Sequence, residues 1–200
     1  TAAFMGELAL EAGFPAGVFN VVTGDAVAIG GEMTSNPLVR KVTFTGSTRT
    51  GKLLIKQCAD TVKNVSMELG GNAPFIVFDD ADLDAAVLGA LASKYRASGQ
   101  TCVCANRILV QDGVYDAFAS ALAARVAALV VGDPMDPAME MGTVIDEEAA
   151  KLFEARVNEA VSQGARLLAG NERRGALYSP TVLDRVAPGF ILPYRDMAAS

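Results

Sequence analysis

A thiol that follows a small, flexible turn is the part of this sequence best suited to chemistry. Cys102 comes directly after Gly99-Gln100-Thr101, and the chain contains no histidine. Most cysteine nucleophiles take a neighbouring imidazole as their base. A carboxylate or a water molecule would therefore have to move the protons here, and Glu68, which opens Glu68-Leu69-Gly70-Gly71, is the candidate carboxylate. This pairing argues against papain-like hydrolysis.

Each of these candidates also has a simpler interpretation. A single cysteine is often a small buried hydrophobe, which is how we interpret Cys58. Glu68 could be an ordinary surface glutamate at a domain junction. Cys102 and Cys104 could begin a zinc site, but two thiols with no histidine and no third nearby cysteine make a weak case. We expect no metal.

A second motif has the composition of a phosphate-binding turn. In Phe44-Thr45-Gly46-Ser47-Thr48 a strand ends, Gly46 allows close backbone approach, and Ser47 lies near the start of a helix. Free amides at a helix N-terminus favour phosphate. The motif matches neither the G-x-G-x-x-G fingerprint nor the P-loop. The alternative is an ordinary helix cap and turn, which is the more common use of such residues.

Alternating strands and helices must position these motifs. Asp80, Asp82 and Asp84 precede a helix that is apolar on almost every side, so we expect it to be buried. The pattern indicates an α/β fold with parallel sheets covered on both faces, and Gly70-Gly71 is the candidate domain boundary. We expect strands at 17–22, 39–44, 62–69, 74–78, 107–111 and 165–169, and helices at 2–12, 26–34, before Cys58, after Asp80, and at 114–130 and 147–163.

Composition narrows the class of protein. The chain has 200 residues, 51% of them hydrophobic, and a net charge of −6, which disfavours nucleic-acid binding. Its longest apolar runs are too short to cross a bilayer, and its start does not resemble a signal peptide. Three cysteines do not make a disulfide framework, so a reducing, cytoplasmic setting is expected. Both ends of the chain look cut.

The order of the motifs is more specific than any one of them. A phosphate turn, then Glu68-Leu69-Gly70-Gly71, then Gly99-Gln100-Thr101-Cys102, with Cys102 thirty-four residues after Glu68, resembles the aldehyde dehydrogenase superfamily along nearly the whole chain. Within it, the segments 70–75 and especially 99–107 resemble the succinate-semialdehyde dehydrogenase subgroup. The resemblance implies a Rossmann-like fold that is incomplete at both ends. Residues 1–69 would belong to the NAD(P)-binding domain and 70–200 to the catalytic domain.

The resemblance also implies roles for individual residues. Cys102 would attack the aldehyde, and Glu68 would activate the water that releases the acid. Arg96 would help to bind the distal carboxylate of the substrate, although it could equally be a solvated residue at a helix end. Cys104 would be the partner of Cys102 in a reversible disulfide switch. The NAD or NADP cofactor would contact Gly24, Phe44, Gly46, Ser47 and Leu69.

The chain departs from the family pattern at both ends. The Asn-Phe-Pro segment of the oxyanion hole does not occur before the motifs found here, and Ile191-Leu192-Pro193-Tyr194-Arg195 stands where Glu-Glu-x-Phe-Gly-Pro is expected. Thr143 replaces a usual proline. We therefore predict little or no activity for this stretch alone, with a non-catalytic truncated protein as the alternative. Full-length relatives are expected to be homo-oligomers that act on small aldehydes.

Overall fold

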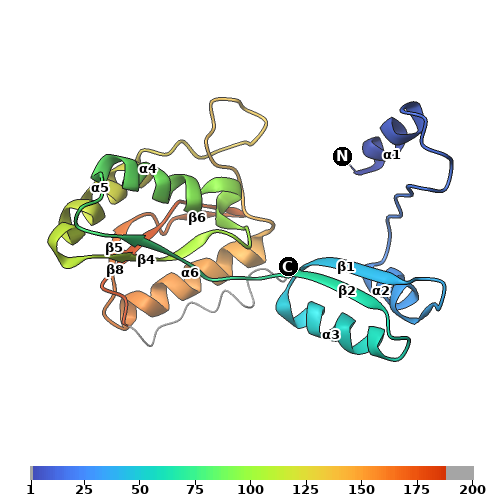
Figure 1. The fold of residues 1–200 in the computed structure, drawn as a ribbon. Coiled ribbons are helices and arrows are strands. Elements are labelled where there is room, and N and C mark those ends of the chain that lie inside the picture. Colours follow the sequence, from blue (N-terminus) through green and yellow to red (C-terminus); the bar gives the residue numbers. More distant parts are fainter. Residues whose placement is uncertain (1, 188–200) are drawn as a thin grey trace. The chain divides into compact units, whose positions relative to one another are not determined.

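A computed structural model describes residues 2–187, and the chain divides into two compact units (Figure 1). Within the described residues, the smaller unit comprises 2–42 and 54–65, and the larger comprises 43–53 and 66–187. The division falls inside two strands rather than at Gly70-Gly71. The predicted functional domains, 1–69 and 70–200, therefore do not coincide with the compact units, and they stay a prediction. The segment Ile191–Arg195 lies outside the described residues.

The smaller unit begins with two helices. Helix α1 (Ala2–Glu11) has no buried residue, whereas α2 (Ala26–Ser35) is capped by Asp25, whose Oδ1 accepts a hydrogen bond from the Ala28 amide at 2.6 Å. The strand predicted at 17–22 does not form, and this segment has no regular structure. Strands need a hydrogen-bonded neighbour, and none of the described strands pairs with it. That prediction was wrong.

Strand β1 (Lys41–Gly46), helix α3 (Thr48–Ala59) and strand β2 (Asn64–Leu69) follow, and β1 and β2 are hydrogen-bonded neighbours. Strand β1 continues through Gly46 instead of ending at Phe44, because Thr45 and Gly46 keep the extended backbone of the strand. Cys58 on α3 is 1% exposed, which confirms its interpretation as a buried hydrophobe.

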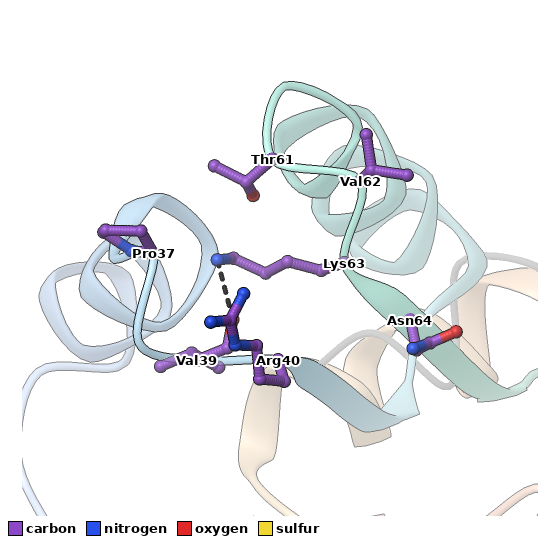
Figure 2. A pocket seen from close by; sticks show the side chains of 7 residues that line it. All are labelled: Pro37, Val39, Arg40, Thr61, Val62, Lys63 and Asn64. Atoms are coloured by element: carbon purple, nitrogen blue, oxygen red, sulfur yellow. Dashed lines mark hydrogen bonds between the residues drawn. The ribbon is translucent and has the colours of Figure 1, made fainter.

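A shallow pocket of about 420 Å³ lies in the smaller unit (Figure 2). Its central side chain is Lys63, which is 9% exposed. The Lys63 ammonium donates hydrogen bonds to the carbonyls of Asn36 at 2.6 Å and Val39 at 2.9 Å. This lysine therefore ties the turn between α2 and β1 to the start of β2.

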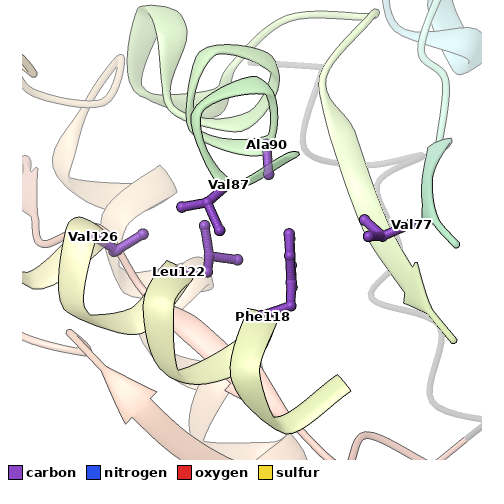
Figure 3. Close-up of a cluster of buried hydrophobic side chains, with 6 residues drawn as sticks. All are labelled: Val77, Val87, Ala90, Phe118, Leu122 and Val126. Atoms are coloured by element: carbon purple, nitrogen blue, oxygen red, sulfur yellow. The ribbon is translucent and has the colours of Figure 1, made fainter. Parts of the chain in front are cut away.

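The larger unit is built on two parallel strands and two helices. Strand β3 (Ala73–Val77) pairs with β4 (Ala105–Val110), as the parallel-sheet prediction requires. Helices α4 (Leu83–Lys94) and α5 (Tyr115–Ala127) pack together over one face of this pair. Their side chains meet in a core with β3 (Figure 3). The buried members of this core are Val77, Val87, Ala90, Phe118, Leu122 and Val126.

The opposite face of the β3–β4 pair is apolar and exposed. Ile76 and Leu109 are register partners and are 55% and 52% exposed. Helix α4 is likewise buried on one side only, since Leu88 is 54% exposed. The expectation that this helix would be buried all round was wrong, because only its Val87–Ala90 side packs against β3 and α5.

The last part of the larger unit adds antiparallel pairs that the sequence pattern did not indicate. After helix α6 (Glu147–Ser162), strand β5 (Arg166–Ala169) pairs antiparallel with β8 (Val182–Asp184), and β6 (Arg173–Arg174) with β7 (Leu177–Tyr178). Only two residues join β6 to β7, and so short a connection permits only the antiparallel arrangement. The fold is thus α/β, with both parallel and antiparallel pairs.

The β5–β8 pair is fastened to α5 by one buried carboxylate. Asp184 is 4% exposed, and its side chain accepts hydrogen bonds from the Tyr115 hydroxyl and from the Arg166 guanidinium, whose Nε lies 3.1 Å away. Burial raises the pKa of the Asp184 carboxyl, but these hydrogen bonds and the Arg166 charge outweigh it, so the pKa lies below its usual value. The ionised carboxylate is therefore the stable form.

Candidate active site

The predicted nucleophile lies on a short turn between helix α4 and strand β4. This nucleophile turn consists of residues 99–106, from the last residue of the 3₁₀ helix η1 (Arg96–Gly99) to the first two residues of β4. Cys102 is exposed at its tip, whereas Cys104, two residues later, is fully buried. The three cysteines are free thiols in this structure. Only Cys102 is therefore accessible to a substrate in this conformation.

The backbone that leads into the turn has an unusual conformation. Ala97, Ser98 and Gly99 have φ values of 50°, 55° and 75°, which place three successive residues in the left-handed region. Gly99 suits this region because it has no Cβ, but Ala97 and Ser98 are strained there. Such strain persists only where the surrounding structure holds it, and it is concentrated at functional sites.

A neighbouring segment holds this strained entry in place. The Ser98 hydroxyl lies 3.1 Å from the Gly142 carbonyl and 3.2 Å from the Thr143 carbonyl, to which it donates. The Ile145 amide donates to Oε1 of Gln100 at 2.9 Å. Residues 142–145 therefore fix both sides of Gly99. Thr143 contributes here through its backbone carbonyl, so this contact does not depend on the type of its side chain.

The buried side of the turn is organised around Lys94 and Cys104. The Cys104 thiol donates to the Lys94 carbonyl at 3.6 Å, and the Thr101 hydroxyl lies 2.7 Å from the same sulfur. The half-buried Lys94 ammonium donates to Oδ1 of Asn106 at 2.6 Å. Burial lowers the pKa of Lys94, and the nearby Cys104 sulfur opposes this shift only in part. The turn is thus held by two sets of contacts, those of residues 142–145 and those of Lys94 and Cys104.

The strand end that carries Glu68 meets this turn through the two glycines. A Cβ placed on Gly71 would lie 2.8 Å from the Cys102 carbonyl oxygen, so only glycine permits this approach. Glu68 itself is exposed on β2, three residues earlier. No hydrogen bond joins the Glu68 carboxylate to the Cys102 thiol among residues 2–187. The structure therefore brings the two backbone segments together without showing a direct contact between the two side chains.

The candidate phosphate turn joins β1 to α3. Ser47 is 3% exposed, and its hydroxyl accepts a hydrogen bond from the Thr50 amide at 3.0 Å, which makes it a helix cap. The first turn of the twelve-residue helix α3 contains no acidic residue, and Arg49 in this turn is exposed. This donor set fits an anionic cofactor group held by backbone amides. The Ser47 side chain itself is already engaged in the cap.

The remaining predicted site residues have plainer surroundings. Phe44 and Leu69 are half-buried on β1 and β2, and Gly24 is exposed in the smaller unit. Arg96 is exposed at the start of η1, as a solvated residue at a helix end would be. Within residues 2–187, no group of three potential metal ligands lies together, and no helix is long and apolar enough to span a membrane.

Sequence reasoning missed Lys94, Ser98 and the residues around Gly142. Lys94 ends an otherwise apolar helix, and a basic residue in the last turn is normally explained by the helix dipole. Ser98 makes its contacts more than forty residues away along the chain. The only local signal was therefore a single lysine eight residues before the predicted nucleophile.

Comparison with known proteins identifies the family. The profile of the aldehyde dehydrogenase family matches residues 1–192, so the chain belongs to this family. It is 59% identical to the NADP(+) succinate-semialdehyde dehydrogenase GabD of Escherichia coli K12. The 182 aligned residues cover 90% of this chain and 38% of that protein. The chain is equally identical over 182 residues to 3-sulfolactaldehyde dehydrogenase of Pseudomonas putida, over 90% of the chain and 37% of that protein.

Solved structures agree with this assignment. The succinate-semialdehyde dehydrogenase of Burkholderia pseudomallei superposes with a TM-score of 0.89 at 55% identity, over 92% of this chain and 39% of that one. The α/β fold predicted from the sequence is therefore confirmed as part of the aldehyde dehydrogenase fold. The chain spans less than two fifths of the length of these relatives.

Proposed function

We propose that this chain carries the nucleophile, the base and part of the cofactor site of an NAD(P)-dependent dehydrogenase that oxidises a semialdehyde to an acid. The observation that carries the proposal is the contact between Gly71 and the Cys102 carbonyl. It brings the backbone that follows Glu68 against the backbone of Cys102, whose thiol is exposed, in a chain that belongs to the aldehyde dehydrogenase family.

In the first step, the Cys102 thiolate attacks the carbonyl carbon of the aldehyde. A carbon–sulfur bond forms, and the carbonyl oxygen becomes the oxyanion of a thiohemiacetal. Loss of hydride from the substrate carbon then converts this species into a thioester. A nicotinamide dinucleotide bound at the turn between β1 and α3 would accept that hydride. The chain's own contribution is to present the sulfur on a turn that hydrogen bonds to residues 142–145 hold in place.

In the second step, water releases the acid. Glu68 takes a proton from this water, the water oxygen attacks the thioester carbon, and the carbon–sulfur bond breaks to return the Cys102 thiolate. No imidazole is needed, because a carboxylate serves as the base. This accounts for an active cysteine in a chain without histidine.

The cofactor would be held mainly by backbone groups. The amides at the start of α3 would bind an anionic group of the cofactor, since the first turn of this helix contains no carboxylate and Arg49 adds positive charge. We assign Gly46 and Ser47 to the pyrophosphate, and Phe44, Leu69 and Gly24 to other parts of the cofactor. The choice between NAD and NADP follows from none of these groups.

The substrate class follows from charge. The names of both relatives describe small aldehydes with an anionic group, a carboxylate in one and a sulfonate in the other. We propose Arg96 as one cation for that group, since a guanidinium matches either anion in a bidentate arrangement. Succinate semialdehyde is the first substrate to test. We also propose a reducing, cytoplasmic setting and assembly as a homo-oligomer.

The test measures reduced nicotinamide by its absorbance, with succinate semialdehyde and NAD or NADP. It uses both the chain itself and the longest reading frame that contains it. We expect activity in the longer protein and little in the chain, because the chain spans 38% of its relative GabD. Cys102→Ala should abolish product formation. A longer protein that folds but oxidises no aldehyde would contradict the proposal in favour of a non-catalytic relative.

Glu68→Gln separates the two steps. Because the amide cannot accept a proton from water, we expect a burst of about one equivalent of reduced cofactor per active site, followed by turnover slowed about a hundredfold or more. Glu172→Gln, at another exposed glutamate, is the matched control and should behave like the unmodified protein. A loss of the burst in Glu68→Gln would exclude a role confined to thioester hydrolysis.

A further inference from the structure

Lys94 contacts both ends of the nucleophile turn. At the entry, a Cβ on Gly99 would lie 3.1 Å from the Lys94 carbonyl oxygen and 3.5 Å from Nζ, so the glycine backbone packs directly on this lysine. At the exit, the Lys94 carbonyl accepts a hydrogen bond from the Cys104 thiol, and the Lys94 ammonium donates one to Oδ1 of Asn106. One residue therefore links the positions where the chain enters and leaves the loop that presents Cys102.

The partly buried ammonium of Lys94 is energetically unfavourable at this position. No ion pair in the described part of the chain includes Lys94, and burial lowers its pKa. A half-buried cation without a carboxylate partner lowers stability relative to an apolar side chain of similar length. Its hydrogen bond to Asn106 offsets part of this cost, because hydrogen bonds from charged donors are stronger than neutral ones.

Cys104 is the natural partner of this lysine. It is 0% exposed, and its thiol is engaged with the Lys94 carbonyl while the Thr101 hydroxyl lies against the sulfur. Thr101 immediately precedes the nucleophile. Cys104 therefore connects the Lys94 backbone to Thr101, the residue next to Cys102.

We propose that Lys94 is a positioning residue, which keeps the nucleophile turn closed by joining Gly99 to Cys104 and Asn106. The assignment rests on the proposed function only in its final consequence, the rate of aldehyde oxidation. Its direct consequence is the protection of Cys104. When the turn is closed the Cys104 thiol is inaccessible, and when the turn opens this thiol meets solvent.

The experiment measures how fast iodoacetamide labels each cysteine of the 200-residue chain under native conditions, with peptides quantified by mass spectrometry. Cys102 should be labelled quickly, and Cys104 and Cys58 slowly, because both are buried. In Lys94→Met, we expect Cys104 to be labelled at least about ten times faster, since the charged hydrogen bond to Asn106 is lost. Labelling of Cys58, on α3, should not change.

Three further variants sharpen the test. Lys94→Gln keeps a donor for Asn106 and should restore most of the protection of Cys104. Asn106→Ala removes the acceptor and should expose Cys104 as Lys94→Met does, which provides a second route if one variant folds poorly. Lys151→Met, at a surface lysine on α6, is the matched control and should leave all three rates unchanged.

Two results would overturn the proposal. One is a Cys104 that stays protected in both Lys94→Met and Asn106→Ala. The other is labelling of Cys104 and Cys58 that accelerates equally, which would indicate general unfolding. In the longer reading frame, Lys94→Met should lower kcat about tenfold with KM for the aldehyde within about twofold. If the unmodified protein oxidises no aldehyde, the proposed function fails, and the labelling rates still decide the role of Lys94.

Discussion

Two charged groups in the larger unit are withdrawn from water in opposite ways. Asp184 is almost completely buried, but Tyr115 and Arg166 hydrogen-bond to it, and its pKa lies below the usual value. Lys94 is half-buried beside the nucleophile turn, near the Asn106 amide oxygen and the Cys104 thiol. Its pKa also lies below its usual value. For an acid this direction means that the charged form is favoured, and for a base it means the reverse.

The difference separates a structural anchor from a group placed for a local purpose. The Asp184 site stabilises its charge, and it joins β8 to β5 and α5. The surroundings of Lys94 destabilise its charged form. A contribution to the free energy of unfolding therefore does not explain why a lysine occupies this position. The comparison predicts that removing the first charge weakens the whole unit, whereas removing the second changes mainly the motion of one turn.

The largest expected effect on stability is that of Asp184→Ala. Removing the carboxylate leaves the Tyr115 hydroxyl without its partner, and it breaks the link to Arg166. We expect the free energy of unfolding to fall by about 3 kcal/mol. Urea unfolding can be followed by tyrosine fluorescence, because the chain has no tryptophan and Tyr95, Tyr115 and Tyr178 belong to the larger unit. Asp116→Ala, where the carboxylate is exposed, is the control and should change stability by less than about 0.5 kcal/mol.

Acid should remove the same contribution without a mutation. The folded-state pKa of Asp184 lies below the unfolded value of 3.8, so its stabilisation is fully present above that value. It is lost as the pH falls through the folded-state pKa. The difference in unfolding free energy between the unmodified chain and Asp184→Ala should therefore shrink below about pH 4. A difference that stays constant down to pH 2 would show that the carboxylate charge does not matter.

Lys94→Met should have a smaller effect on global stability. The lost hydrogen bond to Asn106 is offset by the removal of a desolvated charge, so we expect the free energy of unfolding to change by less than about 1 kcal/mol. The same tyrosine fluorescence measurement checks this. A loss as large as that of Asp184→Ala would make Lys94 a second anchor and end the distinction between the two sites.

The smallest effect should come from alkali. The folded-state pKa of Lys94 lies below the unfolded value of 10.5, so the unfolded chain binds more protons between the two values, and stability rises with pH there. The stability of the unmodified chain relative to Lys94→Met should therefore rise as the pH approaches 10.5. Tyr178 limits the range, because burial raises its pKa to about 12 and its contribution is lost above about pH 10.

The parts of the molecule that follow local rules could be predicted from the sequence. The helix that begins after Asp82 and the parallel strands at 73–77 and 105–110 were expected within two residues, because capping and apolar runs act over short distances. The position of Cys102 after a glycine-containing turn is also local information, and the structure shows this cysteine exposed. The residues that hold this turn were not expected, because Ser98 meets Gly142 only after the chain has folded back.

Failures of the sequence analysis also have a physical pattern. The segment 17–22 has the composition of a strand but no strand to pair with, and composition cannot supply a partner. The hairpin of β6 and β7 was missed because each strand has two residues, too few for an alternating pattern. Lys94 was missed because its importance lies in the residues it meets rather than in its own position along α4.

The exposed apolar face of the β3–β4 pair bears on how the chain self-associates in solution. Ile76 and Leu109 stand side by side in the register, each more than half exposed. Apolar strands with open edges associate with one another at micromolar concentrations. We therefore expect the working lifetime of the chain to shorten as its concentration rises, because association is a kinetic process that the free energy of unfolding does not describe. Dilute samples and short incubations will therefore report on the native turn more faithfully than concentrated ones.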